Sequence, residues 1–303
     1  MTVVGNPANP APTAPATGEP APAADAPPSP VRLLLRNPLA LTGAVAAALL
    51  VLIALFAPLI APYDPTRPDF TAALHPPSWA HWLGTDDLGR DQLSRVLHGV
   101  RASLQIGLLA VALAFAVGVP LGLAAGYYGP LADSVVSRLT DTLLAFPFLV
   151  LAVGLATILG PSLLNATIAI GVSQIPAVIR ITRAETLRLK HLDYVAAAVA
   201  NGGGDRTVLF RHILPNSLSA LTVQATVGIP GAIIGEALLS FLGLGVQPPS
   251  PSLGVMLSSA QAYIAAAPWM AVFPGVAIVA ATLAFNLLGD GLRDILDPRG
   301  DSR

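Results

Sequence analysis

Side chains that could do chemistry are scarce in this chain of 303 residues. They are densest in the stretch 75–91, where Asp86, Asp87 and Asp91 follow two histidines and could suggest a cation site. Gly84 and Gly89 lie close to these aspartates, and Asp near Gly commonly forms turns and helix caps by bonding its own backbone. We therefore expect turns and caps here and no metal site. The chain also has no cysteine, no Gly-x-Ser-x-Gly elbow and no phosphate-binding loop, so we predict no catalytic residue and no cofactor.

Glu236 is the best candidate for a gate or cavity residue, because charged groups near apolar spans are expensive and often functional. A carboxylate hydrogen-bonded to a neighbouring helix is the alternative. Gly231 and Gly235 lie close to it, and small residues at this spacing allow either close helix packing or an open path. Arg138 and Asp141 are three residues apart, so we expect them to pair with each other.

The elements that must position these residues are membrane helices. Hydrophobic residues make up 54% of the chain, charged residues only 11%, and the mean hydropathy is +0.69. A soluble protein carries about 25% charged residues. We predict an all-α polytopic membrane protein with about six transmembrane helices, at 39–61, 102–125, 140–159, 164–184, 217–240 and 269–288.

The domain organisation follows from composition. Nine of the first 30 residues are proline and eight are alanine, which predicts a disordered cytoplasmic tail over 1–31. We assign 32–101 to the first transmembrane helix and an extracytoplasmic loop. A five-helix core follows at 102–299, with a large cytoplasmic loop at 186–216, and a short tail at 300–303 closes the chain.

The orientation comes from the basic residues. If the N-terminus is cytoplasmic, 12 of the 16 Lys and Arg residues fall on the cytoplasmic side, six of them in the single stretch 180–211. Cytoplasmic loops carry an excess of Lys and Arg, so we expect both termini in the cytoplasm of a multi-pass protein.

The basic cytoplasmic loop contains a predicted helical hairpin. Gly202, at the start of a run of glycines, can adopt the positive φ that ends a helix, and Asp205 can cap the next helix. We expect Pro215 to stop this second helix before the next span. Ala197 and Ala198 have small side chains, so one face of the hairpin can approach another protein closely and dock into a groove on it.

This hairpin resembles the cytoplasmic loop motif of ABC importer permeases, which reads Glu-Ala-Ala, three residues, Gly, nine residues, Ile, one residue, Leu-Pro. The chain departs from the motif at two positions, since Ala196 replaces the Glu and His212 stands at the Ile. The missing Glu removes one possible salt bridge to a partner ATPase. The resemblance implies a set of ATPase-coupling residues: Tyr194, Ala197, Ala198, Gly202, Asp205, Arg206, His212, Leu214 and Pro215.

Three further segments, 83–104, 239–249 and 285–299, resemble the C-type permease subunit of dipeptide and oligopeptide ABC importers. The resemblance implies the type I importer permease architecture in a bacterial plasma membrane. It also implies four partners besides the lipid bilayer: a homologous second permease, two cytoplasmic ATP-binding subunits and an extracytoplasmic solute-binding protein. We expect no nucleic acid partner.

The resemblance implies a non-catalytic subunit that takes up dipeptides or oligopeptides while its partners hydrolyse ATP. Import of nickel complexes or another small solute by the same mechanism is an alternative. From other classes, an ATP-independent secondary carrier and a purely structural scaffold remain open. The spans hold no mid-helix charge, although a proton-coupled carrier would be expected to bury a titrating carboxylate on its pathway.

Overall fold

The computed structural model describes residues 37–296, and the predicted tails at 1–31 and 300–303 lie outside this range. The described part is helical and contains no β-strand. Its main helices are α2 (Pro38–Ile60), α3 (Gln92–Tyr127), α4 (Pro130–Leu144), α5 (Phe148–Leu159), α6 (Leu163–Leu189), α7 (Asp193–Ala200), α8 (Asp205–Thr207), α9 (Leu214–Phe241), α10 (Leu253–Ala260) and α11 (Trp269–Leu296). Short 3₁₀ turns lie at Phe70–Ala72 and Gln261–Tyr263.

Five helices in the described range are long and apolar enough to cross a membrane, or six if the bent pair of α4 and α5 counts as one span. This agrees with the predicted all-α membrane fold. Four of the predicted spans correspond directly to α2, α6, α9 and α11. The second span belongs to α3, which is 36 residues long and starts at Gln92 rather than near residue 102. At about 1.5 Å per residue, α3 exceeds the hydrocarbon core of roughly 30 Å by several turns.

The span predicted over 140–159 is not one continuous helix. The structure places a sharp bend inside that range, because α4 and α5 meet at 88°. Pro147 stands at the N-cap of α5 in an extended conformation. Proline has no backbone N–H to donate and disfavours helical geometry in the residue before it, so the helix ends at this point.

Close packing of α3 against α6 forms the centre of the bundle. Gly118, Gly122 and Gly126 occupy one face of α3, and a Cβ atom added at Gly122 would lie 2.5 Å from Cβ of Thr182 on α6. The other two glycines approach α6 equally closely. Small residues therefore bring these two backbones into direct contact, and we call this surface the glycine seam.

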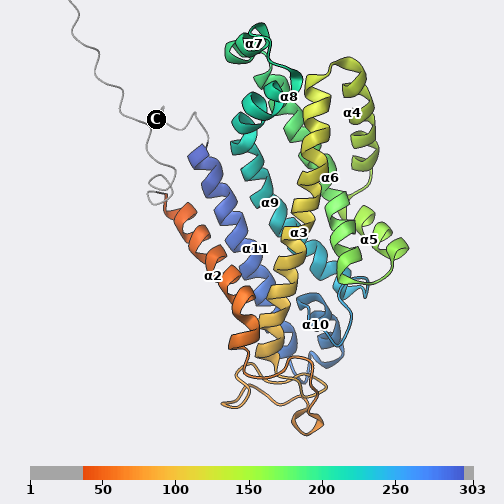
Figure 1. Ribbon diagram of the computed structural model, residues 1–303. Coiled ribbons are helices and arrows are strands. Elements are labelled where there is room, and N and C mark those ends of the chain that lie inside the picture. The colour runs from red at the N-terminus through yellow and green to blue at the C-terminus, as the bar shows by residue number, and fades with distance from the viewer. Residues whose placement is uncertain (1–36, 297–303) are drawn as a thin grey trace, which may run out of the picture.

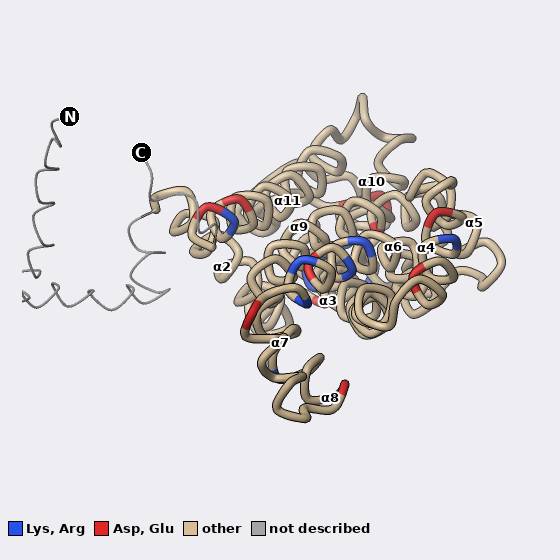
Figure 2. Tube along the Cα trace, turned by 90° about the horizontal axis from the view of Figure 1, so that it is seen from above, with Lys and Arg blue, Asp and Glu red and all other residues tan. Residues whose placement is uncertain are grey.

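The remaining helices flank this centre. The view along the bundle shows α2 and α11 on one side and α4 and α5 on the other, with α3, α6 and α9 between them (Figure 2). Helix α7 extends beyond the bundle at one end, which we call the α7 end (Figure 1). At the opposite end, the loop end, residues 61–91 and α10 cover the helices (Figure 1).

Candidate functional site

The hairpin predicted around residues 191–215 is present at the α7 end. Helix α7 stops at a Schellman motif, in which Gly202 adopts a φ of +79°. The N–H of Gly202 donates to the carbonyl of Val199 at 2.9 Å, and the N–H of Gly203 donates to the carbonyl of Ala198 at 3.0 Å. The predicted glycine stop is confirmed, and it depends on a backbone conformation that a side chain would strain.

The predicted capping role of Asp205 is wrong. Gly204 is the N-cap of α8, and Asp205 is the first helical residue, with no side-chain capping bond. Its carboxylate instead accepts a hydrogen bond of 3.1 Å from the hydroxyl of Tyr127, at the end of α3. Asp205 therefore links the hairpin to α3.

The prediction that Pro215 stops the second helix is also wrong. The chain continues as one helical segment from Asp205 to Phe241, with a π-helical stretch at Val208–Ile213 just before the proline. The wider π turn accommodates the ring and the missing N–H of Pro215. The side-chain amide of Asn216 donates to the carbonyl of His212 at 2.6 Å and helps to satisfy the disturbed backbone.

The inner face of the hairpin packs on the bundle. Val195 of α7 is 2% exposed and belongs to one apolar cluster with residues from α3, α6 and the π-helical stretch. The other members of this cluster are Leu123, Leu189, Val208, Leu209 and Ile213. Lys190 also donates to the carbonyl of Gly126 at 2.8 Å. The hairpin is therefore attached to α3, α6 and α9 together.

The outer face of the hairpin is exposed and carries most of the predicted coupling residues. Ala198, His212 and Leu214 are half-buried. The exposed ones are Tyr194, Ala197, Gly202, Asp205, Arg206 and Pro215. The structure thus brings the predicted set onto one small projecting unit.

A surface hollow of about 490 Å³ lies where the second half of the hairpin joins α9. It is lined by Arg206, Thr207, Phe210, Arg211 and Pro215, and Phe210 is 60% exposed. Within residues 37–296, neither arginine forms an ion pair. Phe210 and Arg211 were not among the predicted residues, although the four-residue spacing from Arg206 to Phe210 and from Arg211 to Pro215 places each pair on one helical face.

Two ion pairs connect α4 to α6 below the hairpin. The guanidinium of Arg183 forms a bidentate pair with Asp133, with one of its bonds at 2.7 Å from Nη2. Asp141 pairs with Arg180 at 3.6 Å, so the expected pairing of Asp141 with Arg138 is wrong. The bend between α4 and α5 lets α4 lie along α6, where its carboxylates meet the arginines of that helix.

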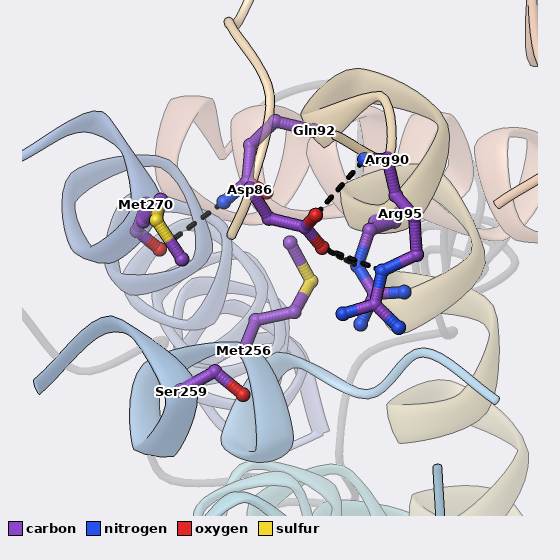
Figure 3. Close-up of a pocket in the computed structure, with 7 residues that line it drawn as sticks. All are labelled: Asp86, Arg90, Gln92, Arg95, Met256, Ser259 and Met270. Carbon is purple, nitrogen blue, oxygen red and sulfur yellow. Dashed lines mark hydrogen bonds and ion pairs between the residues drawn. The ribbon is translucent and has the colours of Figure 1, made fainter. Parts of the chain in front are cut away.

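The aspartates of residues 75–91 form turns and caps at the loop end, as predicted. Asp91 caps α3 by accepting the N–H of Ser94 at 2.8 Å. Asp86 pairs with Arg90 Nε at 2.7 Å and with Arg95 Nε at 3.3 Å (Figure 3). The space between these side chains leaves no room for a water molecule. Within the described range, no group of three His, Asp or Glu residues is placed to hold a metal ion.

Solvated turns order the rest of this loop. Asp69 accepts hydrogen bonds from the hydroxyl of Thr71 at 2.6 Å and from its N–H at 3.1 Å. The hydroxyl bond is the main cause that lowers the pKa of the Asp69 carboxyl below its usual value. This part of the loop therefore carries its charge at neutral pH.

Glu236 lies fully buried in α9, near the loop end. Its carboxylate accepts hydrogen bonds from Ser103 of α3 at 2.5 Å and from Ser240 at 2.8 Å. A Cβ atom at Gly235 would lie 3.3 Å from the ring of Phe148, whereas Gly231 has no neighbouring atom within 4 Å of that position. Gly235 therefore packs inside the chain, and Gly231 presents an open surface.

Two family models match the chain. Residues 118–301 match the model for the binding-protein-dependent transport system inner membrane component. Residues 31–77 match the N-terminal TM domain of oligopeptide transport permease C. These matches confirm the resemblance seen in the sequence segments.

Several relatives cover most of the chain. The dipeptide transport system permease protein DppC of Haemophilus influenzae is 48% identical, covering 86% of this chain and 90% of its own. The di/tripeptide transport system permease protein DppC of Pseudomonas aeruginosa is 47% identical, with coverages of 86% and 88%. The glutathione transport system permease protein GsiD of Pectobacterium atrosepticum is 45% identical, with coverages of 88% and 89%.

A solved structure shares the fold. An inward-facing conformation of the MetNI methionine ABC transporter aligns with a TM-score of 0.55 at 19% identity, covering 67% of this chain and 97% of that chain. This likeness confirms the predicted importer permease architecture, and the apolar helices agree with a multi-pass inner membrane protein. The chain therefore belongs to the family of binding-protein-dependent transport system inner membrane components.

Proposed function

We propose that this chain is the transmembrane permease subunit of an ATP-driven importer that takes up dipeptides or oligopeptides. The observation that carries the proposal is the exposed hairpin at the α7 end, which projects from the bundle and is packed onto three of its helices. Such a unit can receive a displacement from a partner and pass it to the membrane helices. The transport names of relatives at 45–48% identity support the same function.

The hairpin has two connections to the bundle, and this makes it suitable as a lever. Helix α7 follows α6 after only three residues, and its return arm continues without a break into α9. The glycine seam makes α3 move with α6. A pull on the hairpin would therefore change the position of α3 and α6 relative to α9, as alternating access requires.

Each proposed partner can be assigned to one surface of the bundle: the α7 end, the loop end or the exposed side of α9. Two cytoplasmic ATP-binding subunits would dock at the hairpin and hydrolyse ATP, because the sequence contains no phosphate-binding loop of its own. An extracytoplasmic solute-binding protein would meet the loop end. The open surface around Gly231 of α9, continued by exposed Val227 and Ile234, would face the homologous second permease or line the path beside it. This arrangement places both termini in the cytoplasm, as the distribution of basic residues favours.

Substrate choice within the peptide class is the finer part of the proposal. The relatives are named for dipeptides, di/tripeptides and glutathione, which are all short peptides or a peptide-like thiol. Uptake of labelled dipeptides, oligopeptides and glutathione by a deletion strain, with and without the restored gene, tests this choice. Normal peptide uptake in the deletion strain would contradict the proposal.

The coupling role is tested by replacing Gly202 with valine. A β-branched residue is strained at a φ of +79°, so the Schellman motif that ends α7 should be lost, and with it the packing of α7 on the bundle. We expect peptide uptake to fall at least about tenfold, with ATP hydrolysis either uncoupled or lost with the docked subunits. The matched control is Gly204→Ala, because Gly204 has a φ of −69° and no neighbour within 4 Å of its Cβ position. Unchanged uptake by a stably expressed Gly202→Val variant would contradict the role.

A further inference from the structure

Glu236 is a buried acid whose partners are all hydroxyl groups. Within residues 37–296 it forms no ion pair with Lys or Arg. Its carboxylate accepts from Ser103 of α3 at 2.5 Å and from Ser240 of α9 at 2.8 Å, and Ser252 lies beside it. Ser252 is the N-cap of α10. A single carboxyl group therefore joins α3 to α9 at the loop end and adjoins the start of α10.

The hydroxyl groups of Ser240 and Ser252 also accept backbone N–H groups. Ser240 donates to the carboxylate and accepts the N–H of Val246 at 3.2 Å. Ser252 accepts the N–H of Val255 at 3.3 Å and so caps α10. The start of the connection from α9 to α10 is thus tied to Glu236 through Ser240, and its end is capped by Ser252 beside the same carboxyl group. Hydrogen-bonded buried polar groups of this kind stabilise a unique geometry.

Helix α10 has little freedom to move while this network is intact. A Cβ atom at Gly254 of α10 would lie 2.1 Å from the carbonyl oxygen of Ala237 on α9, and one at Gly99 of α3 would lie 2.9 Å from Leu253. On its other side, α10 contributes Met256 to the packed space beside Arg90 and Arg95 (Figure 3). Helix α10 is therefore enclosed between α9, α3 and the loop of residues 61–91.

We propose that Glu236 is a positioning residue that latches α10 in its closed position at the loop end. The latch connects two helices that the hairpin would move apart, since Ser103 stands on α3 and Glu236 on α9. A displacement at the α7 end that separates α3 from α9 withdraws the Ser103 hydroxyl from the carboxylate and releases α10. This inference rests on the proposed function, because the displacement comes from the partner ATPases.

The carboxyl group suits this task because it accepts hydrogen bonds from hydroxyl groups of two helices at once. Both of its oxygens can accept, whereas the amide of glutamine offers one oxygen and adds two N–H donors. Glu236→Gln therefore leaves one of the two hydroxyl groups without its acceptor. Ser103→Ala removes the α3 contact alone, since the described structure gives Ser103 no other side-chain bond.

The absence of cysteine from the chain makes the latch directly measurable. A single cysteine at position 258, replacing the partly exposed Ser258 of α10, is labelled with a membrane-impermeant maleimide in the assembled complex without ATP. We expect the label to react roughly tenfold faster in the Ser103→Ala and Glu236→Gln backgrounds, the effect of losing one buried hydrogen bond worth about 1.4 kcal/mol. Ser103→Thr, which keeps the hydroxyl, should restore the slow rate.

The matched control is Ser173→Ala, because Ser173 is also a buried serine but bonds only to the carbonyl of Ala169 in its own helix. Equal labelling rates in Ser103→Ala, Glu236→Gln and the control would overturn the latch. Faster labelling without any fall in peptide transported per ATP hydrolysed would overturn its part in the cycle. The labelling rate needs neither ATP nor transport, so a failure of the proposed import function is recognised separately, as absent uptake by the parent complex.

Discussion

At the residue scale, two ion pairs join the same two helices but differ in geometry. Arg183 and Asp133 form a bidentate, half-buried pair, whereas Arg180 and Asp141 lie 3.6 Å apart with both side chains mostly exposed. Bidentate pairs with charge-assisted hydrogen bonds stabilise a structure more than exposed single contacts, which contribute about 0–1 kcal/mol. The first pair should therefore hold α4 against α6, and the second should not.

A charge exchange tests this difference. We expect Asp133→Arg to destabilise the complex by about 1–3 kcal/mol and to reduce uptake, and the double variant Asp133→Arg with Arg183→Asp to recover part of both losses. The same exchange at Asp141 and Arg180 is the control and should change the thermal unfolding midpoint little. Unfolding of the detergent-solubilised complex measures the effect, and equal losses at the two pairs would contradict our interpretation.

At the element scale, hydropathy located the helices because apolar length alone decides which segments enter the bilayer. Hydropathy did not predict whether a helix bends or continues at a proline, because that depends on the local backbone and its hydrogen-bond partners. Pro147 produces a bend of 88°, while Pro215 is absorbed by a π-helical stretch, and both prolines look the same in the sequence. The outcome depends on neighbours that the sequence does not place, such as the amide of Asn216.

In the hairpin and around Glu236, too, local features could be predicted from the sequence, whereas contacts with distant residues could not. The spacing of Gly202 predicted the Schellman stop, because a positive φ is a local requirement. The role of Asp205 was not predictable locally, since its partner, Tyr127, is 78 residues away. Glu236 was recognised as unusual from its type and position alone. Its hydroxyl partner on another helix, Ser103 of α3, is 133 residues away and became visible only in the folded chain.

The glycine seam leads to a prediction for the α3–α6 pair. Gly122→Val places a branched side chain where even a Cβ atom would be 2.5 Å from Thr182, so the helices must separate. We expect a loss of about 1–3 kcal/mol in stability together with reduced uptake. Gly154→Val is the control, because Gly154 in α5 has no atom within 4 Å of its Cβ position. Similar unfolding midpoints for the two variants would show that the seam is not tight.

At the scale of the whole molecule, the hollow beside the hairpin adds a positively charged rim to the proposed docking unit. Arg206 and Arg211 line it together with exposed Phe210. Because Ala196 occupies the position where the family motif has Glu, the acidic contact of the motif is missing. We expect these arginines to supply the charged part of the contact with the ATP-binding subunits.

Charge reversal tests this expectation. The double change Arg206→Glu with Arg211→Glu should reduce co-purification of the ATP-binding subunits by about tenfold, and added salt should weaken the parent complex more than the variant. Arg188→Glu is the control, since Arg188 is also exposed but is engaged with Glu185 at 2.7 Å. Retention of the subunits by the double variant would place the contact elsewhere on the hairpin.

Helix α2 lies at the margin of the bundle, beside α11, and a long loop separates it from α3 (Figure 1). Helix α2 nonetheless packs closely on α11, because a Cβ atom at Gly43 would lie 2.3 Å from the backbone nitrogen of Leu288. One family model ends at residue 77 and the other begins at residue 118, so the two parts are also distinct as sequence modules. A helix that docks this closely does not need its covalent tether. Co-expressed fragments, divided within the loop, should therefore reassemble in trans into a working permease.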